Sequence, residues 1–193
     1  ITLDSKNKDS YMFHTPINKV DSIAKKINLP LIKISTAGEK EKELIDLKKA
    51  IELAIKKYEI EGVVTGAVAS TYQTSRIQKI CNELDVYCFN PLWQKDQVEL
   101  LNELIKCKFE VIIVKIAADG FDSSWLGKKI TKKTIESLKG LNKEHGISFS
   151  GEGGEWESMV LNMPLFDKRL KVKKAKKIME NSFTGVYDII DLT

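Results

Sequence analysis

The segment SGEGGEWES, residues 150–158, holds the residue types that most directly indicate chemistry. It places Glu152, Glu155 and Glu157 among three glycines. Glycine lets the backbone adopt positive φ or approach a ligand closely, and carboxylates at this density would repel a phosphate unless Mg²⁺ lay between them. The segment therefore predicts a site for a cation, a hydrogen-bond donor or a magnesium-bridged phosphate. The alternative is a solvent-facing turn that packs Trp156.

A second candidate is GAVASTYQTSR, residues 66–76, which follows the apolar run 62–65 and leads into a helical pattern. In open α/β sheets, ligands bind beyond the carboxyl ends of strands, where a helix N-terminus attracts anions. Gly66 would let a ligand approach the backbone, and Ser70 would cap the helix or donate a hydrogen bond. Arg76 would reach a phosphate if its helix face points toward it. The alternative is that Gly66 only closes a tight turn.

The third feature is the basic segment KRLKVKKAKK, residues 168–177, with seven cations in ten positions. Its alternating lysines resemble an edge strand protected against pairing with other strands. The alternative is an electrostatic surface for RNA or an acidic protein. The formal net charge of the chain is only +4, which argues against strong nonspecific nucleic-acid binding.

The elements that must position these residues belong to a folded chain of 193 residues, with 42% hydrophobic and 30% charged side chains. This composition excludes wholesale disorder and collagen-like or mucin-like classes. No apolar run approaches the ~20 residues of a membrane span, and the first residues match neither a secretory signal nor a transit peptide. We therefore expect a cytoplasmic protein that has no membrane partner.

Cysteine and histidine usage argues against a structural zinc site. Cys81, Cys88 and Cys107 lack CxxC spacing and are expected to be reduced, mostly buried thiols. His14 and His145 stand apart from them in the sequence. No protein-bound metal site is therefore predicted, and any metal should be bound through oxygen.

Strand and helix patterns alternate as far as residue 118, which predicts a parallel sheet covered on both faces. Helices are expected at 18–28, 39–58, 70–84, 95–106 and 131–145, and strands at 31–34, 62–65, 86–89 and 110–118. Ser70 or Thr71 is the expected N-cap of the third helix and Thr131 that of the fifth, and the charged face of the second helix is expected to be solvated. The rhythm then changes to an irregular stretch, one helix and mostly strand-like segments. We therefore place a boundary between a domain at 1–117 and a smaller α+β domain at 118–193.

Five segments together resemble the archaeal and eukaryotic diphthine–ammonia ligase family. They are DSYMFHTPIN (9–18), EGVVTGAVASTYQTSRI (61–77), PLW (91–93), SSWLGKKI (123–130) and GEGGEWESMVLNMPLF (151–166). The resemblance implies an N-type ATP pyrophosphatase domain of the HUP-like, PP-loop kind at 1–117. A family-specific substrate domain would follow at 118–193.

The resemblance also implies a reaction, which is the ATP-dependent amidation of diphthine on elongation factor 2. ATP, with Mg²⁺, would activate the diphthine carboxylate as an acyl adenylate, and ammonia would then displace AMP. The residues implied for ATP are His14, Gly66, Ser70 and Arg76; those facing the activated substrate are Glu152, Gly153, Gly154, Glu155 and Glu157.

We add one hypothesis to the resemblance. Diphthine carries a quaternary trimethylammonium group, and such cations are held by aromatic faces beside carboxylates. Trp125 or Trp156, together with Glu155 or Glu157, would supply such a pocket. The same glutamates would alternatively position ammonium or accept its proton.

One departure from the family pattern concerns the N-terminus. The SGGKDS-type phosphate loop of the family is absent, and SKNKDS at 5–10 has no glycine with which to fold round a phosphate. A missing strand, loop and helix would amount to about 30 residues. We expect an N-terminally incomplete member with poor activity, whose exposed apolar slot favours association with a second copy.

Two other functions remain open from the sequence. One is a different PP-loop ATP pyrophosphatase, such as a tRNA-modifying enzyme, with which the basic segment is compatible. The other is a non-catalytic nucleotide-binding module.

Overall fold

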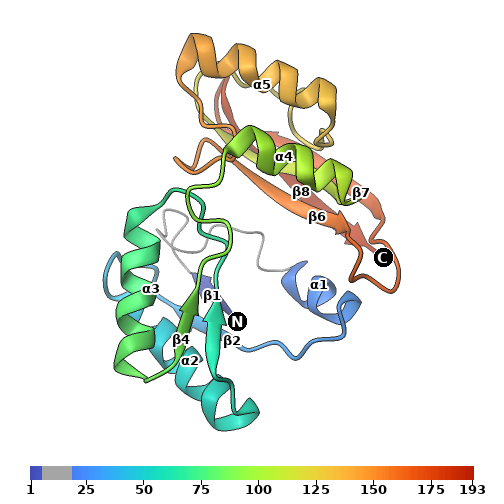
Figure 1. Ribbon diagram of the computed structural model, residues 1–193. Helices are drawn as coiled ribbons and strands as arrows, with labels where there is room; N and C mark the ends of the chain where they lie inside the picture. The colour runs from blue at the N-terminus through green and yellow to red at the C-terminus, as the bar shows by residue number, and fades with distance from the viewer. Residues whose placement is uncertain (6–18) are drawn as a thin grey trace. The chain divides into compact units, whose positions relative to one another are not determined.

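The computed structural model describes residues 1–5 and 19–193, which fold into an α/β arrangement of helices and short sheets (Figure 1). The elements in chain order are β1 (Thr2–Ser5), α1 (Val20–Lys26), β2 (Lys33–Thr36), α2 (Glu43–Tyr58), β3 (Gly62–Val64), α3 (Thr71–Glu83), β4 (Tyr87–Phe89), α4 (Gln97–Lys106), β5 (Glu110–Ala117), α5 (Lys132–His145), β6 (Trp156–Asn162), β7 (Val172–Met179) and β8 (Thr184–Leu192). None of the described helices is both long and apolar enough to cross a membrane.

The chain divides into two compact units. The N-terminal unit comprises Ile1–Ala24 and Leu29–Lys95, and the C-terminal unit comprises Lys25–Asn28 and Asp96–Thr193. The main division therefore falls between Lys95 and Asp96 instead of after residue 117. The reason is that β5 takes all its described strand partners, β6 and β8, from the C-terminal unit.

The N-terminal unit contains two short parallel sheets. Strand β1 pairs with β2, and β3 pairs with β4. The amphipathic helices α2 and α3 contribute their apolar faces to one core with the completely buried Leu3 of β1. Parallel pairing in this half of the chain is confirmed, whereas a single continuous sheet is not formed by the described residues.

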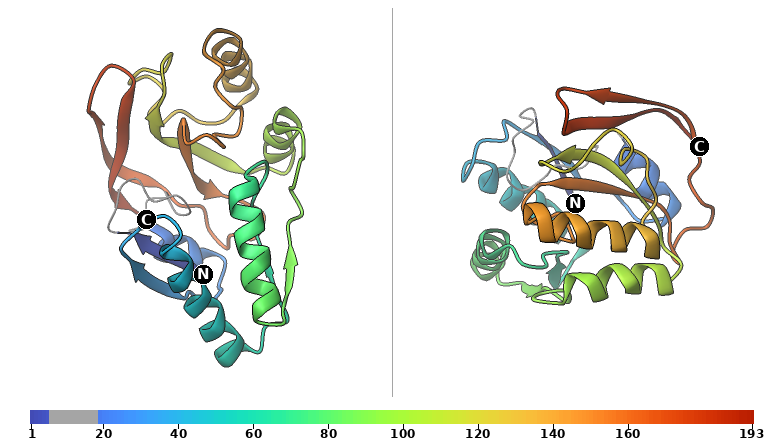
Figure 2. Two further views of the ribbon diagram at one scale, coloured as in Figure 1. Left: turned by 90° about the vertical axis from the view of Figure 1, so that its left-hand side faces the viewer. Right: turned by 90° about the horizontal axis from the view of Figure 1, so that it is seen from above.

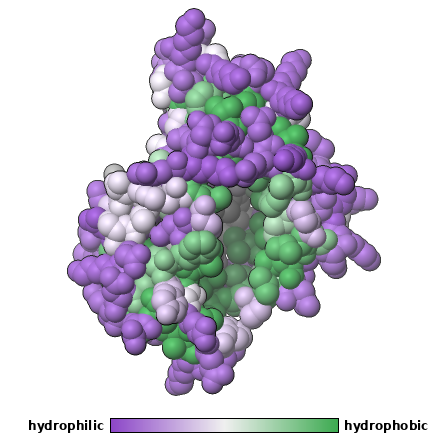
Figure 3. All heavy atoms as spheres, in the orientation of Figure 1, coloured by the Kyte–Doolittle hydropathy of each residue, from purple (hydrophilic) through white to green (hydrophobic). Residues whose placement is uncertain are grey.

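A cavity of about 660 Å³ lies along β3 and reaches Ile1. Its lining includes Leu47 and Ile51 from α2 and Ile77 from α3. Val64, at the end of β3, is 71% exposed. Figure 3 shows hydrophobic residues gathered in the lower part of the view, where Figure 1 draws the strands of this unit. We call this cavity the strand gap.

The C-terminal unit is built on a four-stranded antiparallel sheet in the order β6-β5-β8-β7. Helices α4 and α5 lie side by side on one face of this sheet (Figures 1 and 2). Their apolar residues Leu101, Ile135 and Leu138 share a core with Ile113 and Ile116 of β5.

Strand β5 was predicted to lie in the parallel sheet, and this was wrong. Its apolar run reflects burial on both faces, because Ile112 and Ile113 are both buried. Burial does not determine strand direction, so an antiparallel centre produces the same pattern as a parallel one. The β7 strand lies at an edge of the sheet, as its lysine pattern predicts.

Helix starts follow the capping residues predicted from the sequence. The Ser70 side chain accepts a hydrogen bond from the Gln73 N–H, and the Thr131 side chain accepts one from the Thr134 N–H. These caps satisfy backbone donors in the first turns of α3 and α5. The carboxyl groups of α2 were expected to be solvated, but Glu43 in its first turn is completely buried.

Candidate functional site

The turn after β3 is held in place by the neighbouring strand. The Thr65 N–H donates to the Phe89 carbonyl oxygen at 3.0 Å, and the Thr65 hydroxyl contacts the Asn90 side-chain oxygen. The Ala67 N–H in turn donates to the Thr65 hydroxyl oxygen at 3.3 Å. These bonds fix the backbone on both sides of Gly66 at the carboxyl end of a parallel strand, which is where such sheets bind ligands.

Gly66 faces open space at this turn. A Cβ built on it would have no protein atom within 4 Å, and the residue lines the strand gap together with Gln73 of α3. Ser70 uses its side-chain oxygen as the helix cap, so its position orients α3 toward the turn. Sequence reasoning found Gly66 and Ser70 but missed Gln73 and Asn90, since polar residues in helices and loops are too common to stand out.

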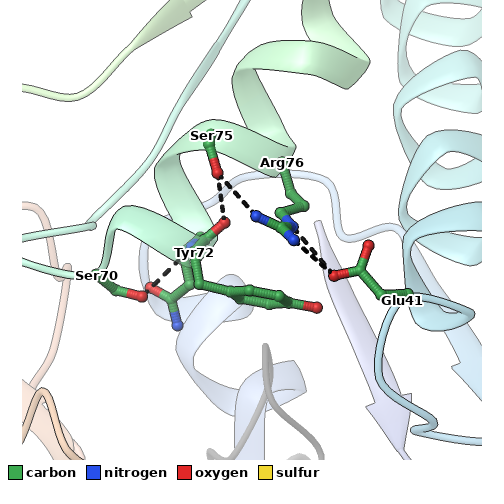
Figure 4. A network of polar contacts seen from close by, with 6 residues as sticks. Glu41, Ser70, Tyr72, Ser75 and Arg76 are labelled. Atoms are coloured by element: carbon green, nitrogen blue, oxygen red, sulfur yellow. Dashed lines mark hydrogen bonds and ion pairs between the residues drawn. The ribbon is translucent and has the colours of Figure 1, made fainter.

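Arg76 points to the loop between β2 and α2, and not to the Gly66 turn (Figure 4). Its Nε and Nη2 both donate to Oε1 of Glu41, at 3.1 and 2.9 Å, and its Nη1 donates to Ser75 Oγ at 3.2 Å. The guanidinium also lies 4.3 Å from the centre of the Tyr72 ring, with Lys40 Nζ 5.2 Å from the same centre. The two cations therefore share one aromatic ring.

This cluster shifts the acid–base properties of its members. The hydrogen bonds from Arg76 hold the pKa of Glu41 below its usual value, and burial raises the pKa of the Tyr72 hydroxyl. Glu41 has a φ of 64°, a left-handed conformation that is uncommon for a residue with a side chain. Such outliers persist where surrounding contacts fix them, and here the contact is with Arg76.

Arg76 and Gly66 line different cavities. Arg76 lines a groove of about 380 Å³ between α2 and α3, together with Glu41 and Lys48. The strand gap is lined by Gln73 and Ile77 of the same helix. The structure therefore places Gly66 and Ser70 in the turn that leads into α3, and Arg76 in a different groove lined by the same helix.

In the C-terminal unit, Glu155 organises the glycine–glutamate segment. Its Oε1 accepts from the Ser148 N–H at 2.9 Å, and its Oε2 accepts from the Ser148 hydroxyl at 3.1 Å and the Gly153 N–H at 2.9 Å. A Cβ on Gly153 would lie only 2.8 Å from this carboxylate, so a side chain at this position would displace it. Gly154 closes the same turn with a φ of 81°.

Glu157 stands on β6 opposite Lys115 of β5. Lys115 Nζ lies 2.9 Å from Glu157 Oε1, and the glutamate side chain is only 13% exposed. Lys115 was not singled out as a site residue, although a single lysine that interrupts an apolar strand was a usable signal. Glu152 lies in the turn itself, partly exposed.

Both tryptophans assigned to the substrate belong to the same hydrophobic core. Trp156 is 4% exposed, and its indole N–H donates to the Ser148 carbonyl oxygen at 3.3 Å. Trp125 is 6% exposed, and Lys128 Nζ lies 4.0 Å from its ring centre. A trimethylammonium group at Trp125 would therefore have to replace the Lys128 ammonium.

Among residues 1–5 and 19–193, no three histidine, cysteine or acidic side chains converge as a metal site would require. His14 falls outside these described residues. The cysteines are free thiols, but only Cys81 is buried, Cys88 is half-buried, and Cys107 is exposed because it follows the last turn of α4. The prediction of mostly buried thiols was wrong on this point.

Comparison with known proteins identifies the family. Residues 1–88 match the diphthamide synthase N-terminal domain, and residues 96–191 match the diphthamide synthase C-terminal domain. A mouse diphthine–ammonia ligase is 34% identical to this chain, over 93% of the chain and 72% of the mouse protein. The chain belongs to the diphthine–ammonia ligase family.

Other ligases of this family match over the same region. The human diphthine–ammonia ligase is 32% identical over 90% of this chain and 70% of its own length. The Saccharomyces cerevisiae ligase is 30% identical over 82% of this chain but only 27% of its own length. The junction between the two matched domains, at residues 88–96, coincides with the division between the two compact units.

Proposed function

We propose that this member of the diphthine–ammonia ligase family converts the carboxylate of diphthine on elongation factor 2 into the amide of diphthamide, using ATP and ammonia. The observation that carries the proposal is the match of both halves of the chain to the two domains of diphthamide synthase. The geometry of the N-terminal unit also supports the proposal. Hydrogen bonds fix the Gly66 turn between β3 and the capped helix α3, and a helix N-terminus beyond the end of a parallel strand binds anionic ligands.

We assign nucleotide binding to the N-terminal unit, as a HUP-like domain. The nucleotide would approach the backbone most closely at Gly66, and Ser70 orients the N-terminus of α3. Arg76 would reach a phosphate after leaving Glu41, and His14 remains assigned to the same site from the family resemblance. The carboxylate oxygen of diphthine would attack the α-phosphorus of ATP, with loss of pyrophosphate.

The second step belongs to the glycine–glutamate segment of the C-terminal unit. Ammonia would attack the acyl carbon, the bond from that carbon to AMP would break, and the nitrogen would lose a proton. Glu152 or Glu157 would accept this proton or hold the incoming ammonium. Glu155 would act as a positioning residue, because three hydrogen bonds already engage its oxygens.

Mg²⁺ does not fit a site made by the described residues, since no three suitable ligands converge among them. We therefore assign it to the triphosphate of the nucleotide and derive no step through it. Gly153, Gly154, Trp125 and Trp156 are assigned to the shape of the substrate pocket.

The test is to incubate the native gene product, defined by intact mass and N-terminal sequence, with ATP, ammonium and diphthine-bearing elongation factor 2. We expect AMP to form only with all three, and the factor to show the mass change of a carboxylate converted to an amide. AMP formation with tRNA in place of the factor, or nucleotide binding without AMP, would overturn the proposal.

A further inference from the structure

All the excess positive charge of the chain lies in its last segment, residues 168–193. Residues 168–193 hold seven cations against three acids, which leaves +4, the formal net charge of the whole chain. The rest of the sequence is therefore neutral. The seven cations, Lys168, Arg169, Lys171, Lys173, Lys174, Lys176 and Lys177, are all exposed. Edge protection alone needs far fewer lysines than this.

The fold concentrates these cations. The order of the sheet leaves β7 at the edge, paired with β8 along its length. Register shifts around Lys174 interrupt the regular alternation, so Lys173 and Lys174 are adjacent and both exposed. Arg169 pairs with Glu110, and Lys177 Nζ donates to the Ser123 carbonyl oxygen, which anchors the two ends of the basic segment.

The sheet register connects this edge to the candidate site. Glu157 lies opposite Lys115, Lys115 lies opposite Val186, and Val186 lies opposite Ile178. Three steps between strands of about 4.8 Å place the edge about 14 Å from Glu157. Because directly opposed residues share a face, the 45% exposed Ile178 lies on the same face as the Lys115–Glu157 pair.

We propose that the basic segment is the docking surface for an acidic region of the protein substrate, beside the residue to be amidated. The inference rests on the proposed function, which requires a protein-bound substrate to reach the glycine–glutamate segment. An acidic protein fits better than RNA, because the basic segment has no aromatic side chain on which a base could stack. Opposite charges on such a surface mainly accelerate association and orient the partner.

The test measures binding of diphthine-bearing elongation factor 2 to the chain at 50 and 300 mM salt, concentrations chosen on either side of physiological screening, about 150 mM. The variant is Lys173→Glu, Lys174→Glu and Lys176→Glu together. The matched control is Lys132→Glu, Lys133→Glu and Lys143→Glu on α5, which are exposed and make the same change of charge. Thermal unfolding of both variants checks that they fold.

We expect the β7 variant to bind at low salt about tenfold more weakly than the original chain, and the α5 control to change little. The difference should shrink at high salt, and ATP binding should not change. Equal loss in both variants, no loss in the β7 variant, or an effect seen only with a single-stranded RNA probe would overturn the docking surface. If binding is salt-sensitive but no amidation occurs, the proposed function alone is contradicted. If the β7 variant amidates the factor as fast as the original chain, the docking surface alone is contradicted.

Discussion

Gly66 occupies a position where an added methyl group would meet open space instead of protein. Gly66→Ala should therefore change the free energy of unfolding by no more than about 0.5 kcal/mol. If the nucleotide occupies this space, the same variant should bind ATP about tenfold more weakly, which isothermal titration would measure. Gly140→Ala is the control, since it also adds a methyl group in open space but lies within α5. Normal ATP affinity in Gly66→Ala would contradict the assignment.

The contact between Arg76 and Glu41 separates two roles for this arginine. Arg76→Ala and Glu41→Gln both remove the ion pair, but only the second keeps the cation. If Arg76 binds phosphate, we expect weaker ATP binding in Arg76→Ala and unchanged or tighter binding in Glu41→Gln. Equal weakening in both variants would show that the pair is structural. Neither variant should lower the melting temperature greatly, because the pair is partly exposed.

The buried thiol of Cys81 leads to a prediction about stability and alkylation at alkaline pH. Burial, followed by the neighbouring Cys88, raises the pKa of Cys81 to about 12. The neutral thiol is thus favoured by folding, and this contribution to stability is complete below the usual thiol pKa and is lost as pH rises toward 12. Iodoacetamide near pH 8 should alkylate the exposed Cys107 before Cys81, as peptide mass mapping would show. Early modification of Cys81 in the native protein would refute this.

At the scale of elements, the local signals were sufficient for helices and insufficient for sheets. Ser70 and Thr131 marked helix starts because capping depends on neighbouring residues in the sequence. The antiparallel pairing of β5 depends on residues more than forty positions away, such as Glu157 opposite Lys115. Likewise, the engagement of Arg76 with Glu41 joins α3 to a distant loop, which no spacing in the sequence reveals.

The turn around Glu155 leads to a prediction about stability and substrate binding. Glu155→Ala removes three hydrogen bonds at once and should cost about 1–2 kcal/mol of unfolding free energy, measured by urea denaturation. It should also raise the concentration of elongation factor needed for half-maximal rate, while ATP binding stays unchanged. Ser148→Ala removes one of these bonds and should have a smaller effect of the same kind. Impaired ATP binding in Glu155→Ala would contradict the assignment of this turn to the substrate.

For the whole molecule, the strand gap is the feature with the broadest effect. Strand β3 pairs on one side with β4, and the gap lies along it with apolar walls. A chain extended by a strand and glycine-rich loop of the kind the resemblance implies should fill this gap and melt at a higher temperature. Amide hydrogen exchange should then become slower at Val63 and Val64. Unchanged exchange at both residues would show that the added strand binds elsewhere.

The position of β8 in the second sheet has a consequence for how the protein is made. In the described sheet, β8 lies between β5 and β7. Residues near 116 therefore cannot form these strand contacts until residues near 185 have emerged from the ribosome. Such long-range closure is slow, because the entropy of a long loop must be lost before the contacts form. During that interval the apolar surface of β5 is exposed to chaperones. Slow synthesis or a shortage of chaperones should therefore affect the yield of the second unit more than that of the first.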